Sequence, residues 1–154
     1  MSTPATTDRY LAPGWFTRQV ANRLMRRLAR MGITVRGSRE LRVRGRRSGQ
    51  WRSVPVNPLT LDGRTYLVAP RGNTEWVRNL RAAGEGELHL GRRAEPFEAT
   101  ELDDAEKAVV LREYLRRWKA EVGAFFDGVG PDATDEELLA AAPRHPVFVL
   151  SAAS

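Results

Sequence analysis

The sequence contains no cysteine, and this absence excludes several kinds of chemistry. Without a thiol the chain has no cysteine nucleophile, no dithiol redox pair, no thiolate zinc site and no iron–sulfur cluster. Histidine is nearly as scarce, since only His89 and His145 occur. Neither has an obvious partner, so the sequence argues against a histidine metal site and against a Ser/His/Asp triad. Any redox activity would therefore require a bound organic cofactor to carry the electrons.

Long hydrophobic runs are also absent. The longest, such as Leu138 to Ala142, span a few residues, whereas a membrane-spanning helix needs about 20. The first residues are polar, and Asp8 precedes any apolar stretch, which does not fit a signal peptide. We therefore expect a cytoplasmic protein, and the missing cysteines are consistent with that compartment.

Lysine is rare as well, because 23 of the 25 basic residues are arginine. The net charge of +6 conceals an asymmetry: residues 1–81 carry 17 basic and 4 acidic side chains, whereas residues 82–154 carry 8 and 15. A GC-rich genome would explain the preference for arginine but not this segregation. Arginine presents a planar set of donors that suits phosphate and carboxylate groups, so the first half of the chain indicates an anionic ligand.

The length of 154 residues fits one domain. Residues 1–14 are predicted to be a flexible leader, and residues 15–154 a single domain. Apolar residues at helical spacing predict an amphipathic helix over residues 15–31, with arginines between them. Packing of this helix on its own domain is favoured, and contact with an anionic membrane surface is kept as the alternative.

From residue 41 onwards the apolar pattern changes to that of short strands. Asp62-Gly63 lies between two apolar runs and predicts a hairpin, and a second hairpin is expected to turn at residues 91–93. Pro55 and Pro58 cannot donate to a strand ladder, so they indicate an edge, a bulge or an interrupted strand.

Helices and a closing strand follow from the capping signals. A short helix is expected over residues 74–82, capped by Thr74 or Asn73. Asp103 is predicted to open a longer helix that continues to about residue 128, and Thr134 a further one. A final strand is expected over residues 147–150. The fold class is therefore α+β, with mostly antiparallel strands around a small barrel, an N-terminal helix and C-terminal helices.

Two loops carry the candidate chemistry. Residues 44–53 combine four arginines with two glycines and two serine hydroxyls, which favours either an anion site or a solvated turn. Residues 69–74 follow a strand and lead into a helix N-terminus, where free N–H groups attract anions. Trp76 either lies against a flat ring or packs with Leu80 in the core, and the spacing alone favours the core.

The order and spacing of three motifs resemble one known family. They are Gly45-Arg46-Arg47-Ser48-Gly49, Arg52-Ser53-Val54-Pro55-Val56 and Trp76-Val77-Arg78-Asn79-Leu80. Together they are similar to the deazaflavin-dependent nitroreductases of actinobacteria, over roughly residues 15–102 and again at residues 146–150. The resemblance implies a split β-barrel like that of FMN-binding oxidases. It also implies coenzyme F-420 as cofactor, an 8-hydroxy-5-deazaflavin with a phosphate and an oligoglutamate tail, with FMN as the alternative.

The resemblance also implies the residues that bind the cofactor. Two departures from the family pattern are visible: Arg47 and Arg71 stand where lysine is common, and the loop before Trp76 is shorter than in the best-known members. The implied cofactor-binding residues are Arg46, Arg47, Ser48, Gly49, Arg52, Ser53, Val54, Pro55, Val56, Val68, Ala69, Pro70, Arg71, Gly72, Trp76 and Asn79.

The expected activity is a reductase that transfers a hydride from the reduced coenzyme to a small electron-poor acceptor: a quinone, a nitroaromatic or an enone. No catalytic side chain is assigned, and Tyr114 is interpreted as a core residue because it lies on the apolar face of its helix. The alternatives are a non-catalytic carrier of the coenzyme and a protein that binds FMN or haem in the same barrel. A nucleic-acid binder is disfavoured, because no DNA-reading motif is present and the aromatic residues do not interleave with the arginines.

Overall fold

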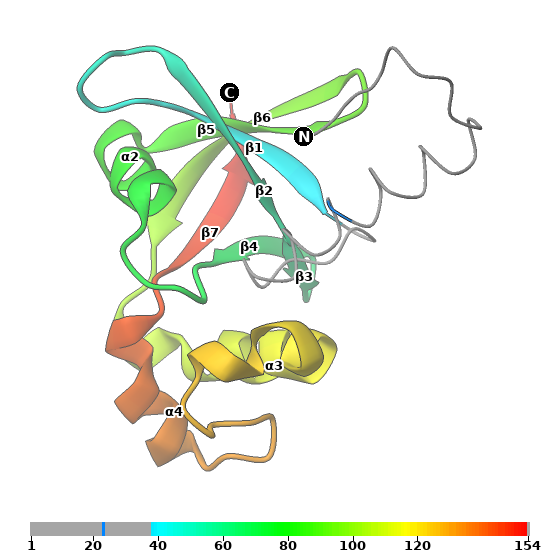
Figure 1. Ribbon diagram of the computed structural model, residues 1–154, viewed down its shortest axis with the longest axis vertical. Coiled ribbons are helices and arrows are strands. Elements are labelled where there is room, and N and C mark those ends of the chain that lie inside the picture. The colour runs from blue at the N-terminus through cyan, green and yellow to red at the C-terminus, as the bar shows by residue number, and fades with distance from the viewer. Residues whose placement is uncertain (1–22, 24–37, 154) are drawn as a thin grey trace, which may run out of the picture.

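A computed structural model describes Arg23 and residues 38–153, and it consists of one curled sheet with helices at one side and one end (Figure 1). All pairs of neighbouring strands are antiparallel, in the order β2-β1-β5-β6-β7-β4-β3. This curled seven-stranded sheet is the expected split barrel. The strands are β1 Arg39–Arg44, β2 Trp51–Val56, β3 Leu59–Leu61, β4 Arg64–Val68, β5 Glu85–Leu90, β6 Arg93–Glu101 and β7 Val147–Ala152.

Local sequence signals set the turns of this sheet. The hairpin between β3 and β4 turns at Asp62 and Gly63, whose φ angles of 52° and 78° are those that Asp-Gly accommodates. Strand β2, which contains Pro55, lies at the edge of the sheet and pairs with β1. An edge position tolerates proline because the outer side of the strand needs no donor. The hairpin and the edge strand are therefore both confirmed.

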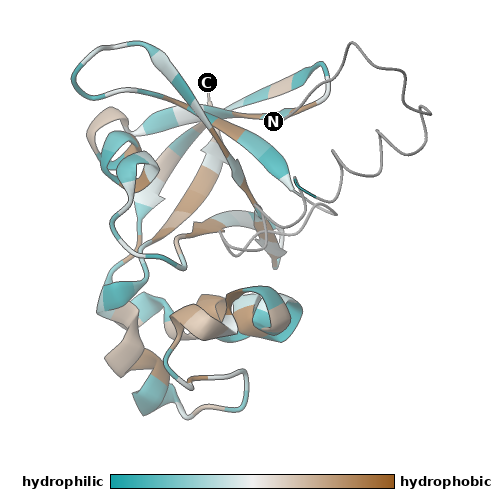
Figure 2. Ribbon diagram, in the orientation of Figure 1, coloured by the Kyte–Doolittle hydropathy of each residue, from teal (hydrophilic) through white to brown (hydrophobic). Residues whose placement is uncertain are grey.

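Helix α2 (Glu75–Ala83) covers one side of the sheet and begins and ends where the sequence predicts. Thr74 is its N-cap, and Gly84 ends it with a φ of 73° and an N–H that donates to the Leu80 oxygen. Val77 and Leu80 are buried against the sheet, together with Leu41, Leu67 and Phe148. Figure 2 shows apolar residues on β7, the strand in the middle of this core.

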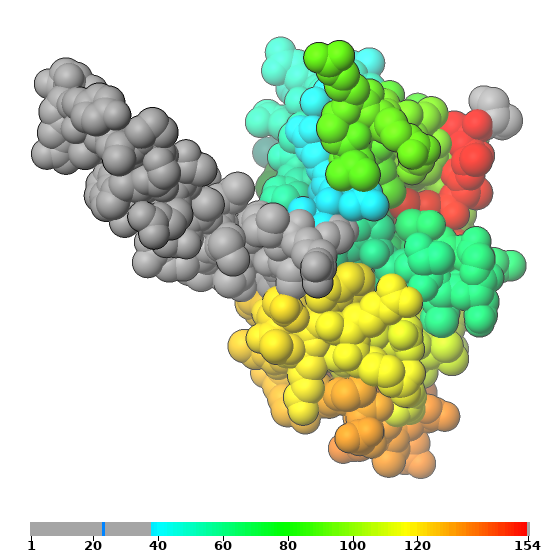
Figure 3. Space-filling model, turned by 90° about the vertical axis from the view of Figure 1, so that its right-hand side faces the viewer, coloured from blue at the N-terminus to red at the C-terminus, as the bar shows by residue number. Residues whose placement is uncertain are grey.

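The helices α3 (Ala108–Val122) and α4 (Asp135–Ala141) lie at the end of the sheet, and Figure 3 shows α3 packed against the sheet with α4 on the far side of α3. Thr134 caps α4 as predicted: its hydroxyl accepts from Glu137 N at 3.1 Å, and the Glu137 carboxylate accepts from Thr134 N at 2.9 Å. The core beneath this helical layer is a separate cluster that includes Leu111, Leu115, Phe126 and Leu138.

Two predicted helix boundaries are wrong. Asp103 opens a 3-10 turn over Asp104–Glu106, and α3 itself begins at Ala108. Between them Lys107 is buried, with its Nζ bonded to Ala142 O at 2.9 Å and to Asp104 Oδ1 at 2.8 Å. At the other end, α3 bends at Trp118, whose φ is −127°, and stops at Val122, after which Gly123–Phe125 forms a second 3-10 turn. Sequence periodicity does not report the two 3-10 turns that bound the helix.

The predicted leader (residues 1–14) and basic helix (residues 15–31) lie outside the described part of the chain, apart from Arg23. Within Arg23 and residues 38–153, no helix is long and apolar enough to cross a membrane.

Candidate functional site

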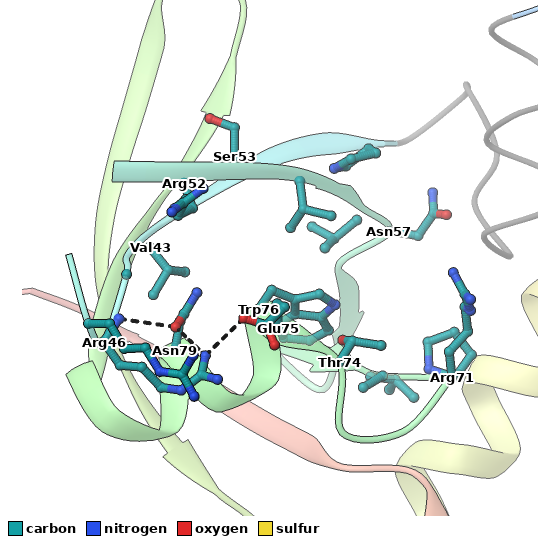
Figure 4. Close-up of a pocket in the computed structure, with 18 of the residues that line it drawn as sticks. Val43, Arg46, Arg52, Ser53, Asn57, Arg71, Thr74, Glu75, Trp76 and Asn79 are labelled. Carbon is teal, nitrogen blue, oxygen red and sulfur yellow. Dashed lines mark hydrogen bonds and ion pairs between the residues drawn. The ribbon is translucent and has the colours of Figure 1, made fainter. Parts of the chain in front are cut away.

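A cavity of about 480 Å³ lies between the β1–β2 loop, the loop after β4 and the start of α2 (Figure 4). It brings together segments that are distant in sequence. Its lining residues are Val43, Gly45, Arg46, Arg47, Ser48, Arg52, Ser53, Val54, Pro55, Val56, Asn57, Val68, Ala69, Pro70, Arg71, Thr74, Glu75, Trp76, Asn79 and Tyr114.

The β1–β2 loop folds on itself because its glycines allow a tight turn. Gly45 N donates to Gln50 O at 2.8 Å, and Gly49 N donates to Gly45 O at 2.9 Å. Gly49 has a φ of 73°, a backbone conformation that favours glycine. The turn keeps Arg46 and Arg47 in the lining of the cavity.

Arg46 connects this loop to helix α2. Its backbone N–H donates to Asn79 Oδ1 at 3.1 Å, and its Nη1 donates to the same oxygen at 2.8 Å. The same guanidinium pairs with Glu75 Oε1 at 3.1 Å and holds the pKa of that carboxyl below its ordinary value. Asn79 is buried. The charge of Arg46 is therefore partly neutralised, and its contacts fix the loop against the helix.

Other arginines at the cavity form no ion pair with the described residues. Across residues 38–153, Arg47, Arg52 and Arg71 pair with no carboxylate, and all three are exposed. Figure 4 shows Arg52 at the same end of the cavity as Arg46, with Arg71 at the opposite end. The positive charge is therefore divided between two ends instead of gathered in one cluster.

The cavity wall between these ends is apolar. Val43, Val54, Val56 and Val68 contribute to it, together with Trp76. The Trp76 ring is half-buried and packs on the sheet core, with its centroid 6.2 Å from that of Phe148. Trp76 therefore packs on the core, as its spacing indicates, and it also lines the cavity, while its contact with a ligand stays a prediction.

The loop after β4 is held from behind by the chain that precedes β7. Ala69 N donates to Pro146 O at 2.9 Å, and His145 Nδ1 lies 3.0 Å from Pro70 O. Gly72 has a φ of 86°, and a Cβ there would lie 3.3 Å from Arg144 O. Because of this support, Ala69, Pro70 and Arg71 line the cavity from a loop of irregular structure.

We expect the stability of the protein to fall as the pH decreases from about 6.5 to about 4. Burial, with Arg144 and Lys107 nearby, lowers the pKa of His145 to about 4, whereas an unfolded chain protonates histidine near pH 6.5. Protons therefore favour the unfolded state across this interval, and the loss should reach at least about 1 kcal/mol. Urea unfolding at several pH values measures it. His145→Asn should flatten the dependence, and an equally steep curve in that variant would assign the effect to other groups.

Of the sequence-predicted residues, all but Gly49 and Gly72 line the cavity, and these two glycines instead shape the adjoining turns. Ser53 lines the cavity, but Figure 4 shows its hydroxyl directed away from it. That hydroxyl bonds to Glu40 and lowers the pKa of its carboxyl.

The prediction omitted Val43, Gly45, Asn57, Thr74, Glu75 and Tyr114. Strand alternation could have found Val43, which lies opposite Arg52. An acidic residue such as Glu75 is not expected at an anion site, and only its contact with Arg46 explains it. Tyr114 is 2% exposed and belongs to the helical core, as predicted, yet it also reaches the cavity; burial raises the pKa of its hydroxyl.

These features fit a ligand with two chemically different parts. The apolar wall with one aromatic ring suits a flat ring system, and the unpaired guanidinium groups suit phosphate and carboxylate groups. A curled antiparallel sheet with such a cavity is the architecture of split-barrel proteins that bind flavins or deazaflavins.

The family comparison agrees. The chain belongs to the F-420H(2)-dependent quinone reductase family, whose pattern matches residues 15–126. It is accordingly an oxidoreductase, and its cofactor is coenzyme F-420. No curated protein matches the chain.

Solved structures show the same fold at low sequence identity. An F-420-H2 dependent reductase is 20% identical with a TM-score of 0.54, over 75% of this chain and 95% of that one. A protein of unknown function from Agrobacterium tumefaciens strain C58 is 16% identical with a TM-score of 0.55, over 83% of this chain and 53% of that one.

Proposed function

We propose that the protein reduces a quinone or a similarly electron-poor small molecule, such as a nitroaromatic or an enone, by hydride transfer from reduced coenzyme F-420. The observation that carries this proposal is the cavity, because it combines an apolar wall with arginines that pair with no carboxylate of residues 38–153. When bound, the reduced deazaflavin supplies the hydride from its ring carbon C5.

The side chains have separate tasks in this proposal. Arg47 and Arg52 would hold the phosphate and the glutamates of the tail by charge-assisted hydrogen bonds. Val56, Pro55 and Trp76 line the cavity and would exclude water from the ring. The chain thereby fixes the ring against an acceptor, which lowers the entropic part of the barrier without a protein nucleophile.

The direct test is a binding titration with coenzyme F-420, FMN and FAD in parallel, followed by turnover with menadione. We expect tighter binding of coenzyme F-420 than of either flavin, and loss of the absorbance of the reduced coenzyme when menadione is added. A preference for FMN would contradict the proposal. Tight binding without turnover across quinones, nitroaromatics and enones would instead support a carrier.

Trp76→Phe should remove a disproportionate share of the quenching of tryptophan emission by the coenzyme. The expectation follows because the Trp76 ring lines the cavity, whereas Trp51 is 45% exposed on an edge strand with the Arg44 guanidinium 4.4 Å from its ring centroid. Trp51→Phe is therefore the matched control and should leave the quenching nearly unchanged. Equal quenching in the Trp76 variant and the wild type would place the ring of the coenzyme elsewhere.

A further inference from the structure

The loop that carries Pro70 and Arg71 to the cavity owes its position to a segment about 75 residues away in sequence. Within the loop, Gly72 N donates to Ala69 O at 3.2 Å, and Thr74 N donates to Gly72 O at 2.8 Å. At Ala69 and Pro70 the loop is held by residues 144–146, through Pro146 O and the imidazole of His145. His145 is the side chain among these contacts, so it can be changed without altering the backbone.

The surroundings of His145 determine which of its nitrogens carries the proton. Pro70 O is a carbonyl and only accepts, so Nδ1, 3.0 Å away, must be the donor. Nε2 is buried and bonds to no group of residues 38–153. The neutral ring therefore has its hydrogen on Nδ1 and a bare Nε2.

The ring itself is held rigidly. His145 is 2% exposed, and it stacks on Phe126 with centroids 3.8 Å apart and planes 17° apart. Two cations, Lys107 and Arg144, lie close enough to oppose its protonation, and no carboxylate of the described residues faces it. The imidazole is therefore a neutral donor fixed between the helical layer and the cavity loop.

We propose that His145 is a positioning residue for the cofactor site: its Nδ1–H holds the Pro70 carbonyl and so fixes the Pro70–Arg71 side of the cavity before the coenzyme binds. This inference rests on the proposed function in one respect: coenzyme F-420 is taken as the ligand that the Pro70–Arg71 side of the cavity contacts. The support of the loop itself is a property of the protein alone. No catalytic role follows, because the ring lies behind the loop and does not line the cavity.

Two substitutions separate the donor from the packing. His145→Asn retains an N–H at about the distance of Nδ1 from the backbone but loses the stack on Phe126. His145→Phe retains an aromatic ring on Phe126 but has no donor. One neutral hydrogen bond is lost in His145→Phe, so we expect its dissociation constant for coenzyme F-420 to rise about fivefold, with His145→Asn within about twofold of the wild type.

A second readout is independent of the coenzyme. Hydrogen exchange at the Ala69 and Gly72 amides reports how often the loop leaves its position. We expect exchange to be faster in His145→Phe than in His145→Asn, at a temperature where thermal unfolding shows both variants to be folded. In the wild type labelled with ¹⁵N-histidine, the His145 ring should show a protonated Nδ1 and a bare Nε2 at neutral pH.

The two proposals fail in different ways. A wild-type protein that does not bind coenzyme F-420 contradicts the proposed function, while the exchange experiment still tests the role of His145. If the wild type binds the coenzyme, equal exchange and equal affinity in both variants would overturn the positioning role. So would a proton on Nε2, or an Asn variant that is impaired more than the Phe variant, because the stack and not the donor would then be responsible.

Discussion

Arg47→Glu is expected to weaken the binding of complete coenzyme F-420 at least tenfold. Arg47 is exposed, lines the cavity and pairs with no carboxylate among residues 38–153, so its charge is available to a ligand. A charge-assisted hydrogen bond contributes about 1.5–3 kcal/mol, and the introduced carboxylate would also repel the phosphate and the glutamates. Isothermal titration of the wild type and the variant measures the difference.

The anionic tail can be separated from the ring by using a truncated ligand. We expect the same substitution to matter much less for the deazaflavin chromophore without phosphate and glutamates. Added salt should weaken the binding of the complete coenzyme but not that of the truncated chromophore, because exposed charges are screened over about 8 Å at 0.15 M ionic strength. Arg92→Glu is the matched control, since Arg92 is an exposed arginine in the β5–β6 turn, outside the cavity lining.

The result that would contradict this interpretation is specific. If the truncated chromophore loses as much affinity as the complete coenzyme, or if salt affects neither ligand, Arg47 does not bind the tail. A similar loss in Arg92→Glu would show that net charge, and not a contact, controls affinity. Because Arg46 is held by Asn79 and Glu75, Arg46→Glu would disturb the loop itself and is a less informative test.

Local signals in the sequence predicted those parts of the fold that short-range chemistry decides. Asp62-Gly63 accommodates positive φ angles, Thr134 and Glu137 cap each other, and Gly84 ends α2 in the left-handed conformation. The start of α3 was predicted wrongly: a capped 3-10 turn precedes the helix, and Lys107 between the two is buried with its Nζ bonded to Ala142 O, 35 positions away. Contacts of that kind join residues far apart in sequence and leave no periodic signature.

In the candidate site, too, local sequence signals predicted some residues, whereas others depend on contacts between distant parts of the chain. The arginines and the apolar strand residues near the cavity were found from their order and spacing, and Gly49 was included because it belongs to the same motif. The structure shows that Gly49 permits the turn without lining the cavity. Glu75 and His145 were not found, because their importance depends on Arg46 and on Pro70, which lie 29 and 75 positions away.

Phe126→Ala should destabilise the protein by about 3–5 kcal/mol, the usual cost of removing a buried aromatic side chain. Phe126 is fully buried, and its ring contacts His145 at 3.8 Å and Tyr114 at 6.4 Å between centroids. Since the free energy of unfolding of such domains is only about 5–15 kcal/mol, the variant should lose a large part of it. Urea unfolding measures this as a lower midpoint at unchanged slope.

The size of the loss distinguishes core packing from a general effect of removing apolar surface. Leu139→Ala removes an apolar side chain that is 49% exposed on α4, and it should change the unfolding free energy by no more than about 0.5 kcal/mol. A cost below about 1 kcal/mol for Phe126→Ala would show that Phe126 is not a central core contact. His145 stacks on the Phe126 ring, so Phe126→Ala would leave an empty space beside the imidazole. Loss of this support should in addition speed hydrogen exchange at Ala69, whose N–H donates to Pro146 O. The helical layer and the cofactor loop would then be linked through this one stacked pair.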